Sequence, residues 1–497
     1  MSAPDKRELR RQFRDQALAR DGHRCRATGR TDALEVHHIT DRAVMPAGGY
    51  VLENAITLNA DVHAEAERFH ISGGTDWAEG LHPDDLYALI GSSRDAALQA
   101  SWALQRRLAQ DRQRTLAAEP AGSARLADAV GPAGIDLDAA ERLLPEVTLT
   151  RGVPQDPRHH AEGDVFTHTR MVCEALAADM PQGLANNDAT ALQLAALLHD
   201  IGKTQTTRIA PDETVSSHGH ARRGAIDARV ALYRLGVDPA LRETVAGLVA
   251  QHMQPGRAIE RDAPEVLIDR LSLQCRLDLL IDLARADARG RKTATPDAYT
   301  QAIEAVELFA LLVEERGLRA GPQTFADPGA RLAYLESRGG YPRDLPKPAP
   351  AGAHVTVMSG LPGSGKDTWL AANRPDLPVV SLDALRVELG VNPADKRGQG
   401  RVVQAARERA REHLRAGRAF AWNATHLSRE QRQQTLQLLR DYDARVEIVH
   451  VETPHAALLE RNRTRAAGLP DAAIEKMLRR WEMPDLTEAH DLTFVHS

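Results

Sequence analysis

The stretch VTVMSGLPGSGKDTW, residues 355–369, decides the fold of the C-terminal part of this 497-residue chain. A run rich in β-branched residues leads into a glycine-rich loop, and a helix should begin where the loop ends. Glycines let backbone N–H groups approach phosphate oxygens, and the helix N-terminus adds partial positive charge. The loop therefore predicts a site for ATP or another NTP. The residues expected to bind the nucleotide are Gly360, Gly363, Ser364, Gly365, Lys366, Asp367 and Thr368.

Asp367 occupies the position after the lysine, where Ser or Thr usually binds Mg²⁺. A carboxylate is also a ligand that this hard cation accepts. We therefore expect Asp367 to hold Mg²⁺ directly or through a water molecule, with Thr368 beside it.

Three further β-runs follow, at residues 379–382, 420–427 and 446–453, with helical stretches between them. This alternation predicts an α/β domain with a parallel sheet. Asp383 follows the first of these runs, so it should lie at the C-terminal end of a strand, where ligands bind. Its carboxylate can accept the proton of an attacking hydroxyl group. Alternatively, Asp383 caps the helix that follows.

The segment ERNRTR, residues 460–465, carries Arg461, Arg463 and Arg465. Arginines grouped in this way suit a lid that stabilises the charge of a triphosphate. The alternative is a solvated helix face.

The motifs GLPGSGKDT, SLDALR, NATH and RNRTR, in this order, resemble the P-loop polynucleotide 5′-kinases. The resemblance implies that Asp383 activates a 5′-hydroxyl group and that Arg386 contacts the acceptor phosphate. It also implies that a lid arginine, Arg463, holds the donor, with Arg461 as a further nucleotide-binding residue.

The middle of the chain carries histidines and aspartates in the order H…HD…D, a set that can bind metal ions. A bound metal lowers the pKa of water and lets it attack phosphorus. Six ligands would allow a dinuclear site and four a mononuclear one, whereas any single histidine could be an ordinary core residue. The candidate ligands are His168, His199, Asp200 and Asp287, with His220 and His252 as additions.

This region, with HHAEGDVFTHT, LLHDIGK and HGHARRGA, resembles the HD phosphohydrolase superfamily. It is most similar to the HD domain of bacterial tRNA nucleotidyltransferases, which acts on 2′,3′-cyclic and 2′-phosphate RNA ends. The resemblance implies the ligands named above, and Mn, Ni, Co or Fe would suit them equally. It leaves His160 and Glu162 without a role.

Residues 25–67 resemble the HNH nuclease motif. That resemblance implies His38 as the general base, His37 and His63 as ligands of one metal, and Asn54 as the residue that orients the base. Only Cys25 remains of the four cysteines that many such domains carry, so no structural zinc is expected. The domain is either a working nuclease or a degenerate docking module.

The composition of the chain and its Pro- and Gly-rich stretches indicate the compartment and the domain boundaries. The formal net charge of −6 excludes a uniformly basic nucleic-acid coat, and three scattered cysteines suit the cytoplasm. No apolar run is long enough to span a membrane. Pro- and Gly-rich stretches at 117–134 and 338–353 suggest independently folded modules. The predicted domains are a small HNH-like α+β (ββα) module at 1–115, an all-α HD domain at 145–335 and an α/β P-loop kinase domain at 352–497.

The order of HD domain and kinase resembles bifunctional RNA end-healing proteins. It implies removal of a 3′-phosphate or 2′,3′-cyclic phosphate and phosphorylation of a 5′-hydroxyl group, with RNA favoured as the substrate and DNA left open. The partner would be a separate ligase, because no K-x-D-G motif is present. The alternatives are an HNH-type nuclease of a defence or toxin system with regulatory HD and NTP-binding domains, and a non-catalytic nucleotide sensor. The oligomeric state stays open.

Overall fold

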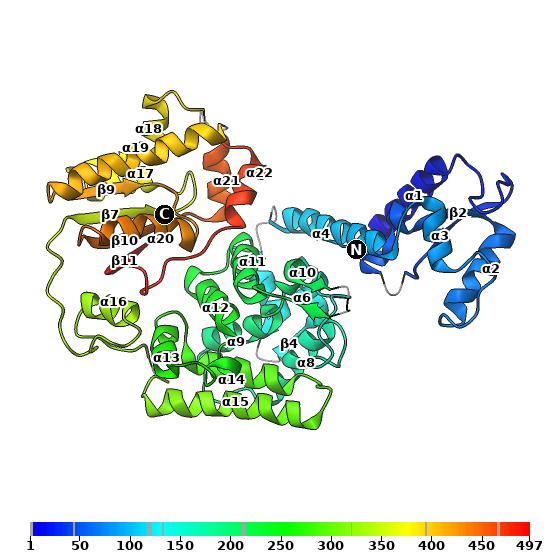
Figure 1. The fold of residues 1–497 in the computed structure, drawn as a ribbon, viewed down its shortest axis with the longest axis horizontal. Coiled ribbons are helices and arrows are strands. Elements are labelled where there is room, and N and C mark those ends of the chain that lie inside the picture. Colours follow the sequence, from blue (N-terminus) through cyan, green and yellow to red (C-terminus); the bar gives the residue numbers. More distant parts are fainter. Residues whose placement is uncertain are drawn as a thin grey trace. The chain divides into compact units, whose positions relative to one another are not determined.

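The computed structural model describes residues 3–42, 45–117, 122–131, 134–210, 212, 214–319, 321–392, 395–464 and 468–497. The chain divides into two compact units (Figure 1). The first comprises Met1–Thr115, Val147–Pro154 and Asp164–Phe166, and the second comprises Leu116–Glu146, Gln155–Gly163 and Thr167–Ser497.

The first unit contains a two-stranded antiparallel sheet followed directly by a helix, the ββα order that the sequence predicts. The strands pair from Leu34 opposite Asn59 to His38 opposite Ala55. One face of this hairpin packs into a core that includes Ile39, Ile56 and Tyr87. The described elements are α1 (Ala3–Arg20), β1 (Leu34–His38), the 3-10 turns η1 (Pro46–Gly49) and η2 (Leu52–Asn54), β2 (Ala55–Asn59), α2 (Ala60–Ile71), α3 (Pro83–Ile90) and α4 (Arg94–Ala117).

The middle of the chain is helical, as predicted, apart from two ladders of two-residue strands. Every residue of α9 from Ala191 to Leu198 is buried, so this helix forms the centre of its bundle and carries the following His199 and Asp200 into the interior. The described elements are α5 (Gly122–Ala129), β3 (Val130–Gly131), β4 (Gly134–Ile135), α6 (Leu137–Leu143), α7 (Pro145–Thr148), α8 (Val165–Ala178), α9 (Asn186–Leu198), α10 (Lys203–Thr206), β5 (Arg208–Ile209), β6 (Val215–Ser216), α11 (His220–Arg234), α12 (Pro239–Gln251), η3 (Pro255–Arg257), α13 (Pro264–Ser272), α14 (Leu277–Arg289), α15 (Pro296–Glu315) and α16 (Pro328–Glu336).

Gly202, two residues after the histidine–aspartate pair, lies against the start of α11. A Cβ atom at this position would lie 2.1 Å from the carbonyl oxygen of His220, the first residue of α11. The two segments can approach this closely only because residue 202 has no side chain.

The C-terminal part contains the predicted parallel sheet, which in the described residues has five strands in the order β11-β10-β7-β9-β8. Strands β9 and β8 lie on one side of β7, and β10 and β11 lie on the other, so the loop that follows β7 leaves the sheet from its central strand. Ligands of parallel α/β sheets bind at the C-terminal ends of such strands. The described elements are β7 (His354–Ser359), α17 (Lys366–Asn373), β8 (Val379–Ser381), α18 (Leu382–Glu388), α19 (Lys396–Arg415), β9 (Phe420–Asn423), α20 (Arg429–Arg440), β10 (Arg445–Glu452), α21 (His455–Thr464), α22 (Asp471–Leu478) and β11 (Asp491–His496).

The helical and the α/β parts, which the linkers predict to be independently folded modules, pack against each other. Both belong to the second compact unit, and side chains of α11 share a buried core with side chains of α21 and α22. The Pro-rich stretch 338–353 does run without helix or strand, but flexibility of a linker does not prevent the regions it joins from packing together.

Parts of the other predicted linker, 118–121 and 132–133, lie outside the described residues, and α5 occupies 122–129 within it. Among the described helices, none combines the length and the apolar character needed to cross a bilayer.

Candidate metal centre and phosphate-binding site

Four imidazoles and two carboxylates converge in the helical part; we call these residues the HD centre: His168, His199, Asp200, Asp287, His220 and His252. His168 on α8 lies with its Nε2 atom 3.1 Å from Oδ1 of Asp287 on α14. Nε2 of His199 lies 3.3 Å from Oδ2 of Asp200. The predicted residues are thus brought together from three helices, α8, α11 and α14, and from the C-terminal ends of two others, α9 and α12.

Asp200 faces two groups of ligand atoms, one with each carboxylate oxygen. Its Oδ2 atom is directed at His199 and, at 3.9 Å, at His168. Its Oδ1 atom lies 3.4 Å from Nε2 of His220 and 3.7 Å from Nε2 of His252. A carboxylate in this position can bridge two metal ions, so the geometry favours the six-ligand alternative.

The Nδ1 atoms fix which nitrogen each imidazole offers. His199, His220 and His252 each place Nδ1 2.7 to 2.8 Å from the backbone carbonyl oxygen three residues earlier. A carbonyl accepts only, so Nδ1 carries the hydrogen and Nε2 presents a lone pair to the centre. The two lone pairs of His220 and His252 face each other at 3.3 Å, an arrangement that a cation between them would stabilise.

The electrostatics of the centre suit metal ligands. Burial lowers the pKa of His252 to about 3 and lowers that of His220, so both imidazoles are neutral at pH 7. Burial opposes ionisation of Asp200, but its neighbours, the positive charge of Lys203 first among them, outweigh burial and hold the pKa of Asp200 well below its usual range. Neutral imidazoles and ionised carboxylates are the protonation states that bind metals.

Buried atoms without a partner also fit a metal. Nε2 of His199 and Oδ1 of Asp200 are buried and make no hydrogen bond. Such atoms are costly unless something compensates them. A divalent cation held by His168, His199, Asp200 and Asp287, with a second one at His220 and His252, would satisfy both atoms.

Two basic side chains, those of Lys203 and Arg291, lie beside the acidic ligands of the HD centre. Nζ of Lys203 lies 2.7 Å from Oδ2 of Asp200 and also donates to Gln155. Arg291 pairs with Asp287 at 2.7 Å. Lys203 therefore faces the ligands rather than serving only the helix dipole, and both side chains are placed to contact an anionic substrate.

Glu162, to which the motifs assign no role, lies directly behind His168. Its Oε1 atom is 2.9 Å from Nδ1 of His168 and 2.9 Å from Nδ1 of His160. Its Oε2 atom accepts a hydrogen bond from the backbone N–H of Lys292. Burial opposes ionisation of Glu162, but its contacts with the two histidines outweigh it and lower the pKa. Glu162 thus places a carboxylate oxygen beside Nδ1 of His168 as an ion pair, at the ring position where the other three imidazoles hydrogen-bond to backbone carbonyls.

Glu162 lies six residues before His168 in an irregular segment, so no helical or strand spacing relates the two residues. Its role could not be found from sequence.

The phosphate loop, residues 360–366, has the geometry that its glycines predict. Gly360 has φ 141°, and a Cβ atom there would lie 2.3 Å from the carbonyl oxygen of Val451. Gly365, with φ 100°, immediately precedes α17. Nζ of Lys366 donates to the carbonyl oxygens of Gly360 and Leu361, both at 2.9 Å, so it lies across the loop mouth where phosphates would bind.

Asp367 and Asn423 form a pair at the end of the central strands. Nδ2 of Asn423, the last residue of β9, donates to Oδ1 of Asp367 at 2.6 Å. The same two oxygen-bearing side chains can contribute ligands to Mg²⁺. Thr368 follows Asp367 on α17 and is exposed.

Asp383 and Arg386 lie one helical turn apart on α18 and form an ion pair. Ser381, not Asp383, caps this helix, because Ser381 Oγ accepts from the backbone N–H of Ala384. The Asp383 side chain is 88% exposed and available to an acceptor. Arg386 is held from its other side by Gln399 at 2.8 Å.

The lid arginines differ from one another. Arg461 on α21 donates to Oγ of Ser497, whose own hydroxyl donates to the carbonyl of Ser364 in the phosphate loop. Arg463 is exposed and pairs with Glu460 at 3.6 Å. Arg465 lies outside the described residues. The geometry therefore favours Arg461 over Arg463 as the lid residue nearest the loop.

The first compact unit has a metal-ligating group of its own: His37, His63 and Glu67. Oε1 of Glu67 lies 3.2 Å from Nδ1 of His37 and 3.3 Å from Nε2 of His63. Glu67 was not among the predicted ligands, although its position four residues after His63 on α2 could have revealed it.

His38 points to the opposite face of β1, as alternation in a strand requires. Its ring stacks on Phe13 at 4.4 Å, and burial lowers its pKa to about 4. The side chain of Asn54 bonds to Thr40 and Tyr87 and so stabilises the loop rather than orienting His38.

Where a zinc ligand would be expected beside Cys25, Oγ1 of Thr28 hydrogen-bonds to the side chain of Asn59 at 3.3 Å.

Comparison with known proteins identifies two of these regions. Residues 165–291 match the HD domain family and residues 355–484 match a family described as an AAA domain. The chain therefore contains an HD domain and a P-loop domain. Both fold predictions for these regions are confirmed.

The curated relatives include a "Multifunctional CCA protein" from Halorhodospira halophila, 36% identical over 159 residues, which cover 31% of this chain and 36% of the relative. A protein of the same name from Laribacter hongkongensis is 36% identical over 172 residues, 33% of this chain and 40% of the relative. The chain thus spans less than half the length of these relatives. A solved sugar kinase from Janibacter sp. HTCC2649 has 19% identity and a TM-score of 0.23, over 29% of this chain and 85% of its own.

Proposed function

We propose that this chain heals broken nucleic-acid ends, with RNA as the favoured substrate and DNA as a second one. The HD domain would remove a 3′-phosphate or open and remove a 2′,3′-cyclic phosphate. The P-loop domain would transfer the γ-phosphate of ATP or another NTP to a 5′-hydroxyl group. The observation that carries the proposal is the Asp200 carboxylate, which is directed at two separate groups of ligand atoms. The same compact unit holds the phosphate loop and Asp383, which lies in the first turn of α18, directly after β8.

At the HD centre, bound divalent metal would acidify a water molecule and neutralise phosphate charge. The protein's own part is to hold that charge in a buried, fixed array of imidazoles and carboxylates. Lys203 and Arg291 border the array and would bind the remaining anionic oxygens of the substrate.

At the P-loop, backbone N–H groups and Lys366 would bind the donor phosphates, and Asp367 and Asn423 would position Mg²⁺. Asp383 would accept the proton of the 5′-hydroxyl group, and Arg386 would bind the neighbouring phosphate of the acceptor. Arg461, on the lid helix α21, would contact the phosphates of the donor. Arg463, on the same helix, would not contact them. Sealing of the healed ends would fall to a separate ligase.

The test is to incubate an RNA oligonucleotide bearing a 5′-hydroxyl and a 3′-phosphate with ATP, Mg²⁺ and Mn²⁺, and to map both ends. We expect a 5′-phosphate and a 3′-hydroxyl in the product. A parallel DNA oligonucleotide measures the preference for RNA. Recovery of both original ends would reject the proposal.

A second candidate function is nuclease activity of the first compact unit. It is favoured by one observation, the convergence of His37, His63 and Glu67 on one another beside the strand that carries His38. The predicted general base, His38, points to the opposite face of β1 from these three residues, so this alternative requires the His38 ring to turn toward them. Metal-dependent strand cleavage that is lost in His38→Ala and in Glu67→Gln would support it, and cleavage that survives both changes would exclude it.

A further inference from the structure

Helix α11 of the HD domain packs directly against the nucleotide-binding elements of the P-loop domain. Ile226, Val230 and Tyr233 on α11 share a buried core with residues of the phosphate loop and of the lid helices α21 and α22. The residues on the P-loop side of this core are Leu361, Leu427, Leu458, Ile474, Leu478 and Trp481. Leu361 belongs to the phosphate loop itself and is 4% exposed.

Two polar contacts hold the segment that joins β10 to the lid. The hydroxyl of Tyr233 donates to the carbonyl oxygen of Thr453 at 2.6 Å. The guanidinium of Arg242 on α12 donates two hydrogen bonds of 2.6 Å to the carboxylate of Glu452, and both side chains are almost fully buried. Because Val451 touches Gly360, this short segment also forms one wall of the phosphate loop.

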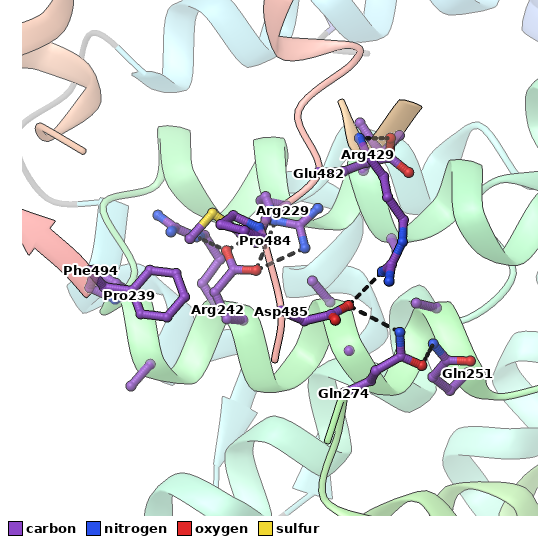
Figure 2. Close-up of a pocket in the computed structure, with 18 of the residues that line it drawn as sticks. Arg229, Pro239, Arg242, Gln251, Gln274, Arg429, Glu482, Pro484, Asp485 and Phe494 are labelled. Atoms are coloured by element: carbon purple, nitrogen blue, oxygen red, sulfur yellow. Dashed lines mark hydrogen bonds and ion pairs between the residues drawn. The ribbon is translucent and has the colours of Figure 1, made fainter. Parts of the chain in front are cut away.

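Further contacts between the HD domain and the P-loop domain lie at residues 481–485, before β11 (Figure 2). We call all of these contacts together the junction. Nη1 of Arg229 donates to the carbonyl oxygen of Trp481, and Arg222 pairs with Glu482 at 2.6 Å. Asp485 accepts from Gln274 of the HD domain and from Arg429 of the P-loop domain. These contacts border a cavity of about 570 Å³ between α11, α12 and the segment before β11.

The same two helices reach the HD centre at one end. His220 is the first residue of α11, and His252 directly follows α12. Neither helix contains an internal break, so each joins a metal-facing histidine to a contact with the P-loop domain.

We infer that α11 and α12 of the HD domain position the lid and the β10 end of the P-loop domain, with Tyr233 and Arg242 as positioning residues for the phosphate donor. This inference rests on the proposed function, because it assumes that the loop binds a nucleotide. Neither residue contacts the nucleotide. Each acts through Glu452, Thr453 or the lid helices.

The first test uses the full chain with Tyr233→Phe, which keeps the ring in the core and removes only the hydrogen bond to Thr453. We expect the Kd for a fluorescent ATP analogue and the KM for ATP to rise about three- to tenfold, as loss of one buried hydrogen bond predicts, with kcat little changed. Tyr299→Phe on α15, far from the junction in sequence and structure, is the matched control.

The second test replaces the buried ion pair by a neutral one, Arg242→Gln with Glu452→Gln, because a single change would leave a buried charge and could prevent folding. We expect weaker ATP binding while melting temperature and bound metal at the HD centre are retained. Unchanged ATP affinity in folded variants would overturn the inference, and so would a parallel loss of metal, which indicates general destabilisation. A wild-type chain that binds no nucleotide would overturn the kinase proposal together with the inference.

Discussion

The two candidate sites of the second compact unit differ in how far they are assembled before a substrate binds. At the HD centre, His168, His199 and Asp200 have side chains at most 2% exposed, and acceptors fix the ring orientation. At the P-loop site, Asp383 is 88% exposed and Lys366 bonds to its own loop. A centre that must hold metal ions benefits from fixed ligands, whereas a site for a large nucleotide must open to admit it.

The largest expected effect is at the assembled site. Asp200→Asn removes the one carboxylate that faces both ligand groups, so phosphate-end hydrolysis should fall about 1,000-fold and bound metal should be lost. Phosphoryl transfer should persist. Metal content and end-group assays measure both. Asp179→Asn, an exposed change, is the control, and an Asp200→Asn chain that keeps all of its metal would show that Asp200 does not hold the metal.

The second largest effect is expected at the P-loop site, where a substitution should impair phosphoryl transfer and leave the HD centre active. Lys366→Ala removes the cation at the loop mouth, and phosphoryl transfer should fall about 100-fold while hydrolysis at the HD centre is retained. Lys347→Ala in the exposed linker serves as the control. If Lys366→Ala silenced hydrolysis too, the two chemistries would share one site and the comparison would collapse.

A smaller effect should follow from loosening one ligand of the HD centre. Glu162→Gln leaves His168 in place but takes away the carboxylate behind its Nδ1 atom, so metal affinity should fall about 10- to 100-fold. Competition with a chelator measures this affinity without relying on activity. The surface change Glu174→Gln on the same helix as His168 should leave the affinity unaltered. Equal affinities for both variants would mean that Glu162 has only a structural role.

The sequence predicted what depends on local spacing. The order of His168, His199, Asp200 and Asp287 indicated that they meet, and the glycines of the phosphate loop indicated its shape. The glycines belong to one short motif, whereas His168 and Asp287 are 119 residues apart and are connected by the order of motifs that the HD phosphohydrolases share.

Contacts between distant segments could not be predicted in that way. Arg242 and Glu452 are 210 residues apart and form one of the most buried ion pairs of the described chain, yet each alone in the sequence resembles a surface charge. Their pairing depends on how the HD and P-loop domains pack, and that packing has no local pattern. The same reason explains why a Pro-rich linker suggested independent modules that the structure joins.

The smallest expected effect is on the pH dependence of stability, and it separates buried histidines with a free ring nitrogen from buried histidines whose two ring nitrogens both have a partner. In the HD centre the Nε2 atoms face each other, whereas His426 of the P-loop domain has a partner at both nitrogens: Met358 O at 2.9 Å and Thr435 Oγ1 at 3.0 Å. His426 is therefore a satisfied core residue. Burial lowers its pKa to about 4, against an ordinary value of about 6.5.

Between about pH 6.5 and pH 4 the unfolded chain binds a proton at this position and the folded chain does not, so stability should fall as the pH falls through that window. Above pH 6.5 both states are neutral and the contribution is constant. His426→Gln keeps hydrogen-bonding groups but does not titrate, so the melting temperature of this variant should depend less steeply on pH. His496→Gln, an exposed change on β11, should keep the wild-type slope. An unaltered slope in His426→Gln would contradict this prediction and would assign the acid sensitivity to other histidines whose pKa burial lowers, such as His450 and His455.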